Sequence, residues 1–157
     1  MLAPMTYSTN EGRQELLDAT AEAIDSIGVA IAALGAAYEM VDESSADRLE
    51  EELFAPAQAA YGRGKRGCSE FAARHGLTPH ALAAAPTAGA PSAGPAGYVE
   101  QAVEAAQHAD DILSELQDSL LPVEVGDPEF RTALADVRTR LGELASHADA
   151  WQRMLGR

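Results

Sequence analysis

Two pairs of glutamate and histidine, each four residues apart, are the best metal-ligand candidates in the chain. Glu104 precedes His108, and Glu143 precedes His147. Di-iron bundles use Glu-x-x-His on two helices, with an inward glutamate from each of two others. Here the spacing is four instead of three, the helical register turns His108 outward, and Glu143 lies off the apolar seam. The pairs therefore predict helix-stabilising contacts and no metal or other cofactor.

The segment Gly62–Gly67 (GRGKRG) matches the phosphate-binding pattern G-x-G-x-x-G. That pattern binds a pyrophosphate only where a strand precedes it and a helix N-terminus follows it. Here a helical segment precedes it, so no dinucleotide site is expected. Its cations, with one further arginine, form the only predicted basic patch. Either they pair with neighbouring helices, or they dock an acidic partner or a phosphate. The patch comprises Arg63, Lys65, Arg66 and Arg74.

Residues suited to nucleophilic or acid–base catalysis are sparse. The single cysteine, Cys68, falls on a predicted apolar face, where thiols are usually inert. No serine lies in a nucleophile-elbow context. Phosphotransfer bundles flank an exposed histidine with lysine and glycine, whereas His108 and His147 are each followed by Ala-Asp. We therefore predict a non-enzymatic protein.

Three aromatic residues lie on predicted apolar faces, namely Tyr61, Phe71 and Trp151. Packing in the core explains them most simply. The alternative is an apolar pocket between helices that binds a small molecule.

Charge limits the partners of the chain. With 25 acidic and 11 basic residues among 157, the formal net charge is −14. Phosphates and anionic lipid surfaces would be repelled, so we expect neither nucleic-acid nor membrane binding.

Residues 1–10 lack the basic and apolar regions of a signal peptide, and the apolar stretch 26–38 is too short to span a bilayer. These features predict a cytoplasmic protein.

Apolar residues recur at helical spacing in four segments, where each row predicts an apolar seam, and no segment has strand periodicity. The seam of the first segment has one polar member, Thr20, and the seam of the third ends with its helix at Leu120. The seam of the fourth comprises Phe130, Leu134, Val137, Leu141, Leu144, Ala148, Trp151 and Leu155.

Capping signals fit this division: Asp42 precedes the second helix, Gly76 follows it, and Asp127-Pro128 begins the fourth. Pro56 should kink the second helix or start a new one. The predicted organisation is a flexible N-terminus (1–9), a first helical hairpin (10–75), an Ala/Pro/Gly-rich linker (76–97) and a second hairpin (98–157).

These elements predict one all-α domain, an antiparallel up-down-up-down four-helix bundle. The charge distribution favours one arrangement of its helices. Residues 1–42 carry seven acids and one base, and residues 97–127 carry eight acids and no base. Placing the first and third helices on a diagonal would separate these like charges.

The function predicted from this pattern is that of an adaptor or accessory subunit with an acidic surface. The expected partner is a protein, with a second copy of the chain among the candidates, because alanine-rich seams bury little area per residue. The alternative function is binding of a small molecule in the apolar pocket between helices.

Overall fold

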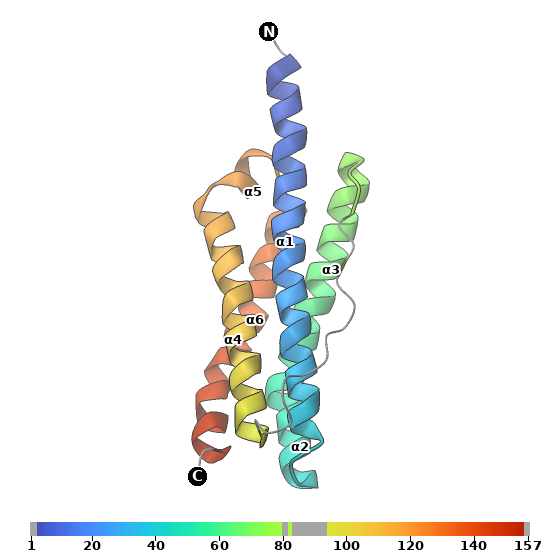
Figure 1. Cartoon of the computed structure of the whole chain (residues 1–157). Helices are drawn as coiled ribbons and strands as arrows, with labels where there is room; N and C mark the ends of the chain where they lie inside the picture. Colours follow the sequence, from blue (N-terminus) through green and yellow to red (C-terminus); the bar gives the residue numbers. More distant parts are fainter. Residues whose placement is uncertain (1–2, 80–81, 83–93, 156–157) are drawn as a thin grey trace.

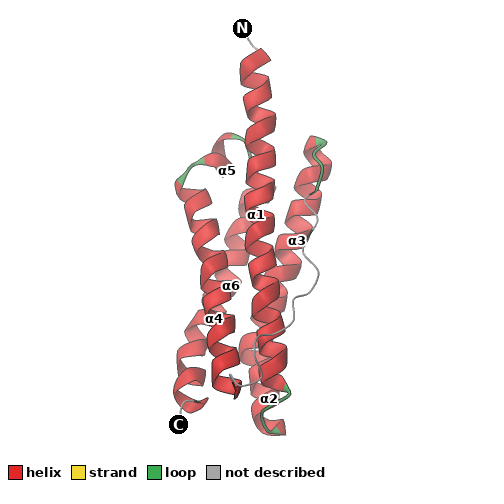
Figure 2. Cartoon of the chain, in the orientation of Figure 1, coloured by secondary structure: helices red, strands yellow, loops and turns green. Residues whose placement is uncertain are grey.

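In a computed structural model, which describes residues 3–79, 82 and 94–155, the chain is all-helical (Figures 1 and 2). No strand occurs in these residues, so the all-α part of the predicted fold class is confirmed. The elements in chain order are α1 (Ala3–Tyr38), α2 (Glu43–Leu49), the π-helical segment η1 (Glu50–Phe54), α3 (Ala55–His75), α4 (Gly94–Asp118), α5 (Leu121–Glu124) and α6 (Pro128–Leu155).

The four long helices differ from the predicted arrangement in order and direction. Helix α1 packs against α4 and α3, and α6 packs against α3 and α4. The contact between α1 and α4 is the most extensive in the molecule. Helices α3 and α4 run in the same direction, opposite to α1 and α6 (Figure 1). The up-down-up-down order, with the first and third helices on a diagonal, is therefore wrong.

Close packing of small side chains explains why the two acidic helices are neighbours. A row of alanines on α1 is fully buried, and α4 also buries alanines. The Ser26 hydroxyl of α1 donates a hydrogen bond of 2.7 Å to the backbone carbonyl of Ala105 on α4. Exposed charges contribute only about 0–1 kcal/mol per pair, so their repulsion does not outweigh this packing. The buried alanines are Ala23, Ala30, Ala33 and Ala37 on α1, and Ala102, Ala106 and Ala109 on α4.

The predicted helix caps are confirmed. Asp42 accepts a hydrogen bond of 2.7 Å from the backbone N–H of Ser45 at the start of α2. Gly76 ends α3 in the left-handed region, with φ at 65°. Pro56 lies in the first turn of α3, so it does start a new helix after the π-helical segment. Asp127 caps α6 through the backbone N–H of Phe130, at 2.7 Å.

Three helix boundaries differ from the prediction. Helix α1 begins at Ala3, inside the segment predicted to be flexible. Helix α4 begins at Gly94, inside the predicted linker 76–97, of which residues 80–81 and 83–93 lie outside the described part of the chain. Leu120, predicted to end the third helix on its apolar seam, has a left-handed φ of 65° and is exposed, because the chain turns there into α5.

The apolar seam of α6 is confirmed over its described side chains. All seven predicted positions before the last are buried. On α1, the only polar member of the predicted seam is Thr20, which is buried and donates a hydrogen bond of 2.8 Å to the carbonyl of Leu16. The α6 positions are Phe130, Leu134, Val137, Leu141, Leu144, Ala148 and Trp151.

Two glycines of the literal G-x-G-x-x-G pattern allow α3 to approach its neighbours. A Cβ at Gly64 would lie 2.9 Å from Ile24 Cγ1 of α1, and a Cβ at Gly67 would lie 2.8 Å from Ala133 Cβ of α6. Both glycines are buried. The pattern therefore serves helix packing here.

We expect Gly67→Ala to destabilise the protein by about 1–2 kcal/mol. Overpacking costs about 1–3 kcal/mol, and the gain in helix propensity returns up to about 1 kcal/mol. Gly62→Ala is the matched control, because its Cβ would meet only the flexible end of Arg66, at 3.6 Å. The control should be neutral or stabilising. Urea unfolding of both variants measures the difference, and equal free energies of unfolding would contradict the packing role.

Candidate functional site

One polar network joins the C-terminal end of α3 to the start of α6. The Asp127 carboxylate accepts hydrogen bonds of 2.7 and 2.8 Å from Arg74 Nε and Nη2, and lies 2.8 Å from His75 Nε2. Arg74 Nη1 is also 2.9 Å from Glu129. Beside this network, the rings of Phe71 and Phe130 stack with centroids 4.3 Å apart. These contacts hold α3 and α6 together at this end of the molecule.

The pKa of Asp127 reflects its three kinds of hydrogen-bond partner. Burial raises the pKa, but the hydrogen bonds from Arg74, the Phe130 backbone N–H and His75 outweigh burial. The pKa falls from 3.8 to about 2. The carboxylate is therefore ionised at any pH where the chain is expected to work, which suits a structural anchor and not a general acid.

A second network surrounds Glu52 at the other end of the same helix pair. The buried Trp151 ring donates from Nε1 to the Glu52 carboxylate at 2.6 Å, and Arg48 lies 5.3 Å from the ring centroid. In a regular α-helix the N–H of residue 56 would bond to the Glu52 carbonyl, but Pro56 has no N–H. His147 Nδ1 of α6 lies 3.0 Å from that carbonyl, at hydrogen-bond distance. The π-helical turn is thus stabilised by α6.

The structure divides the predicted basic patch. Arg63 pairs with Asp136 of α6 at 3.0 Å, and Arg74 belongs to the Asp127 network. Lys65 and Arg66 are exposed, and Lys65 faces the groove between α1 and α3. Docking of an acidic partner or phosphate on the patch remains a prediction. Among the described residues, Arg63 and Arg74 are engaged in ion pairs, so Lys65 and Arg66 are the members of the patch that such a partner would contact.

The three predicted pocket aromatics do not lie together. Phe71 and Trp151 are buried at opposite ends of α3 and α6, about 30 Å apart along the helix axis. Tyr61 lines a cavity of about 410 Å³ between α1 and α3, with Cys68 in its wall. Burial raises the pKa of the Cys68 thiol to about 12, so it is protonated at neutral pH and a poor nucleophile.

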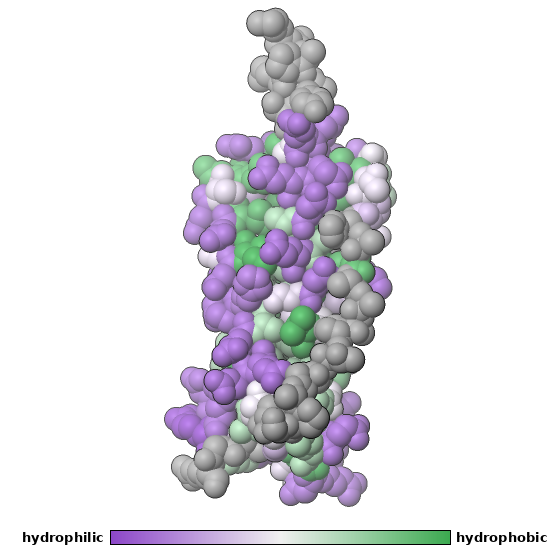
Figure 3. All heavy atoms as spheres, in the orientation of Figure 1, coloured by the Kyte–Doolittle hydropathy of each residue, from purple (hydrophilic) through white to green (hydrophobic). Residues whose placement is uncertain are grey.

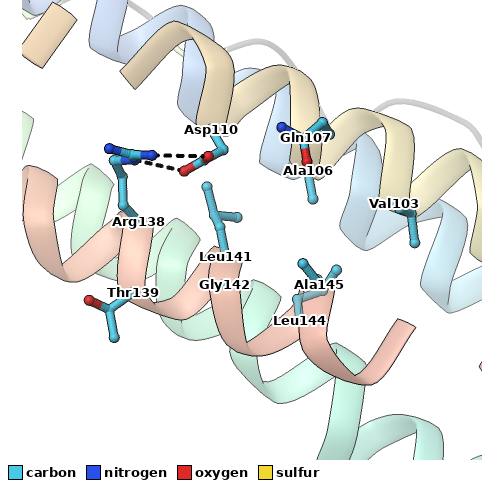
Figure 4. A pocket seen from close by; sticks show the side chains of 10 residues that line it. All are labelled: Val103, Ala106, Gln107, Asp110, Arg138, Thr139, Leu141, Gly142, Leu144 and Ala145. Atoms are coloured by element: carbon cyan, nitrogen blue, oxygen red, sulfur yellow. Dashed lines mark hydrogen bonds and ion pairs between the residues drawn. The ribbon is translucent and has the colours of Figure 1, made fainter. Parts of the chain in front are cut away.

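A second groove runs between α4 and α6 (Figure 4). Its volume is about 340 Å³. Asp110 of α4 and Arg138 of α6 pair at 2.8 Å at one end of it, and are the only charged residues in its lining. The rest of the lining is uncharged: Gln107 and Thr139 are polar, and the others are apolar or small, among them Val103, Leu141 and the exposed Gly142.

Acidic side chains follow the outward faces of α1 and α4, here called the acidic face. Figure 3 shows hydrophilic residues along both helices on the side facing the viewer. Because α1 and α4 are neighbours, the molecule concentrates acids on one side and places its base-bearing helices, α3 and α6, on the other. The acids concerned are Glu11, Glu15, Asp18, Glu22 and Asp25 of α1, and Glu100, Glu104, Asp111, Glu115 and Asp118 of α4.

The described residues contain no group of three or more metal-ligating side chains that could hold an ion. Of the two Glu-His pairs, Glu104 and His108 are exposed on α4, and His147 bonds to the Glu52 carbonyl.

The stretch Thr9–Tyr38 of α1 is long and apolar enough to span a membrane by length and composition, and half of its most apolar window is buried. Buried core helices of soluble proteins also meet that criterion.

Sequence reasoning missed the partners of Glu52 and Asp127. The only available signal for Glu52 was its position four residues before Pro56, which predicts an unpaired carbonyl. The capping role of Asp127 could be predicted from the sequence, whereas its ion pair with Arg74 depends on how α3 packs against α6.

Comparison with known protein families, curated proteins and solved structures finds no match to this chain.

Proposed function

We propose that this chain is a non-enzymatic protein–protein interaction module, an adaptor or accessory subunit of the cytoplasm. Its proposed frame is a four-helix bundle of α1, α3, α4 and α6, with one long crossover connecting the two parallel helices α3 and α4. We propose that the acidic face binds a protein partner with a basic surface.

The observation that carries this proposal is the side-by-side placement of the two most acidic helices. The exposed charges alone would favour separating these helices, but the close packing of their alanine rows outweighs that weak repulsion. Packing α1 against α4 instead concentrates acids from residues 11–25 and 100–118 over one side of the molecule. Such a one-signed surface attracts partners of opposite charge and raises their association rate.

Charge reversal on the acidic face tests the proposal. We expect the triple variant Glu15→Lys, Glu22→Lys and Glu104→Lys to weaken partner binding at least about tenfold, because rim and face charges govern association of this kind. All three side chains are exposed, so the fold should be retained. The matched control reverses Glu51 and Glu70, which are exposed on η1 and α3.

The measurement is quantitative mass spectrometry of polypeptides that copurify with each tagged variant from the native host at two salt concentrations. Support requires a polypeptide retained by the wild type and the control, lost from the triple variant, and weakened by salt. Equal retention by all three proteins, or no stoichiometric polypeptide, would contradict the proposal.

The second candidate function is small-molecule binding in the α1–α3 cavity. It rests on the volume of about 410 Å³ and on the Tyr61 ring in its wall. Native mass spectrometry of the same preparation separates the two candidates, since a retained ligand adds a few hundred daltons to the bare chain and a polypeptide partner adds far more.

A further inference from the structure

We infer that Leu120 and Val123, here called the apolar corner, form an anchor that inserts into an apolar pocket of the protein partner, and that lysines or arginines border this pocket. The inference rests on the proposed function, because it concerns the same partner. It adds an apolar contact to a surface that otherwise offers charge.

The apolar corner is exposed to an unusual degree for residues of its type. The side chain of Leu120 is 56% exposed and that of Val123 is 60% exposed, more than any other large apolar side chain in the part of the chain that the structure describes. Both lie where the chain turns from α4 through α5, at one end of the molecule (Figure 1). The other two large apolar residues of this turn, Leu121 and Val125, pack against the core.

Leu120 also adopts a backbone conformation that suits glycine. Its φ is 65°, and no other residue except glycine has a positive φ among those described. At the end of a helix this conformation is usually taken by glycine or asparagine, because the Cβ of other residues is strained there. The side chain does not repay this strain within the fold, since it is not packed against the core. Strain that the fold does not explain points to a contact outside the chain.

The turn holds the apolar corner in a fixed position. The N–H of Val123 donates a hydrogen bond of 3.0 Å to the Leu120 carbonyl. From α1, Arg13 Nε donates to the Val125 carbonyl at 2.9 Å, and a Cβ at Gly12 would lie only 3.1 Å from Val125 Cγ1. An anchor preorganised in this way loses little conformational entropy when it binds.

Charge identifies the kind of partner. Residues 110–130 contain seven acids and no base, and the nearest exposed base along the chain is Arg131 of α6. Glu115, Asp118 and Glu124 are exposed and flank the apolar corner in the chain, and the first two belong to the acidic face. Acids at this position disfavour an anionic membrane and the same corner of a second copy. They fit a protein pocket with cations at its edge, which the same partner would present to the acidic face.

Calorimetric titration tests the inference, and the probe is the polypeptide that copurifies with the wild-type chain, after its own purification. We expect Leu120→Gly and Val123→Ser each to weaken binding by at least about tenfold, because a few anchors carry most of the affinity of an interface. The heat-capacity change of binding should become less negative, since less apolar surface is buried. Its salt dependence should stay that of the wild type, whereas the triple variant of the acidic face should reduce it. Met40→Ser is the matched control, because Met40 is 46% exposed at the other end of the molecule.

Urea unfolding separates a binding role of Leu120 from a structural one. Leu120→Gly should leave the unfolding midpoint unchanged or raise it, because glycine adopts a positive φ without strain. A lower midpoint would show that the leucine serves the fold, and would overturn the inference.

The remaining outcomes distinguish the inference from the proposed function. Variants of the apolar corner that bind the polypeptide like the wild type would overturn the inference and leave the proposed function standing. A wild type that retains no polypeptide would contradict the proposed function and the inference together. Binding of the wild type to phosphatidylcholine vesicles, lost in Leu120→Gly, would overturn the protein partner in favour of a lipid surface.

Discussion

Replacing Trp151 with alanine is expected to lower the free energy of unfolding by about 3–5 kcal/mol, the range for deleting a large buried aromatic side chain. Trp151 is 1% exposed and lies where α6 meets the π-helical turn. Its loss leaves a cavity, removes the hydrogen bond to Glu52 and removes the ring beneath Arg48. Urea unfolding followed by far-ultraviolet circular dichroism gives the value without relying on tryptophan fluorescence.

Trp151→Phe is the matched control for packing. It keeps most of the buried ring but lacks the Nε1–H, and the partly exposed Glu52 carboxylate can then be solvated by water. We expect a cost of about 1–2 kcal/mol. If Trp151→Phe lost as much stability as Trp151→Ala, the hydrogen bond to Glu52 would be the dominant contribution. A loss below about 1 kcal/mol for Trp151→Ala would contradict the packing role of the ring.

Asp127→Ala is expected to cost about 2 kcal/mol, since it removes the N-cap of α6 together with the acceptor for Arg74 and His75. Asp136→Ala is the matched control. Asp136 also pairs with an arginine of α3, but its side chain is 51% exposed and it caps no helix. Its removal should change stability by about 0–1 kcal/mol.

The effect of Asp127→Ala should depend on pH. The folded-state pKa of Asp127, about 2, is below its ordinary value of 3.8, so its contribution is complete above the ordinary value and is lost as the pH falls through about 2. The stability difference between wild type and variant should therefore shrink between about pH 4 and pH 2. Thermal unfolding across this range measures it, and a difference that is independent of pH would contradict the assignment of the carboxylate as the stabilising group.

Local features of this fold could be predicted from sequence because each depends on a few neighbouring residues. Asp42, Gly76 and Asp127 mark helix ends through their own side chain or backbone conformation. The α6 seam was also predictable, since every member faces the same core. Helix order was not, because the surface charges used to choose it are weak beside the close contact of alanine rows between α1 and α4.

The candidate surfaces likewise depend on long-range packing and could not be predicted from neighbouring residues in the chain. The three aromatics were chosen for residue type, yet Phe71 and Trp151 belong to opposite ends of the core and only Tyr61 lines a cavity. The apolar corner carried no sequence motif at all. Its exposure depends on α1, where Gly12 packs beside Leu121 and so fixes which side of the turn faces the core.

The parallel course of α3 and α4 has a consequence for folding kinetics. The contacts that join the helices connect distant parts of the chain, as in Ser26 with Ala105, Glu52 with Trp151, and Arg13 with Val125, which are 79, 99 and 112 residues apart. Closing such long loops costs chain entropy before the packing compensates for it. The chain should therefore fold more slowly than a helical protein of equal length whose helices pack mainly against their neighbours in sequence, and the α1–α4 contact is a natural rate-limiting event.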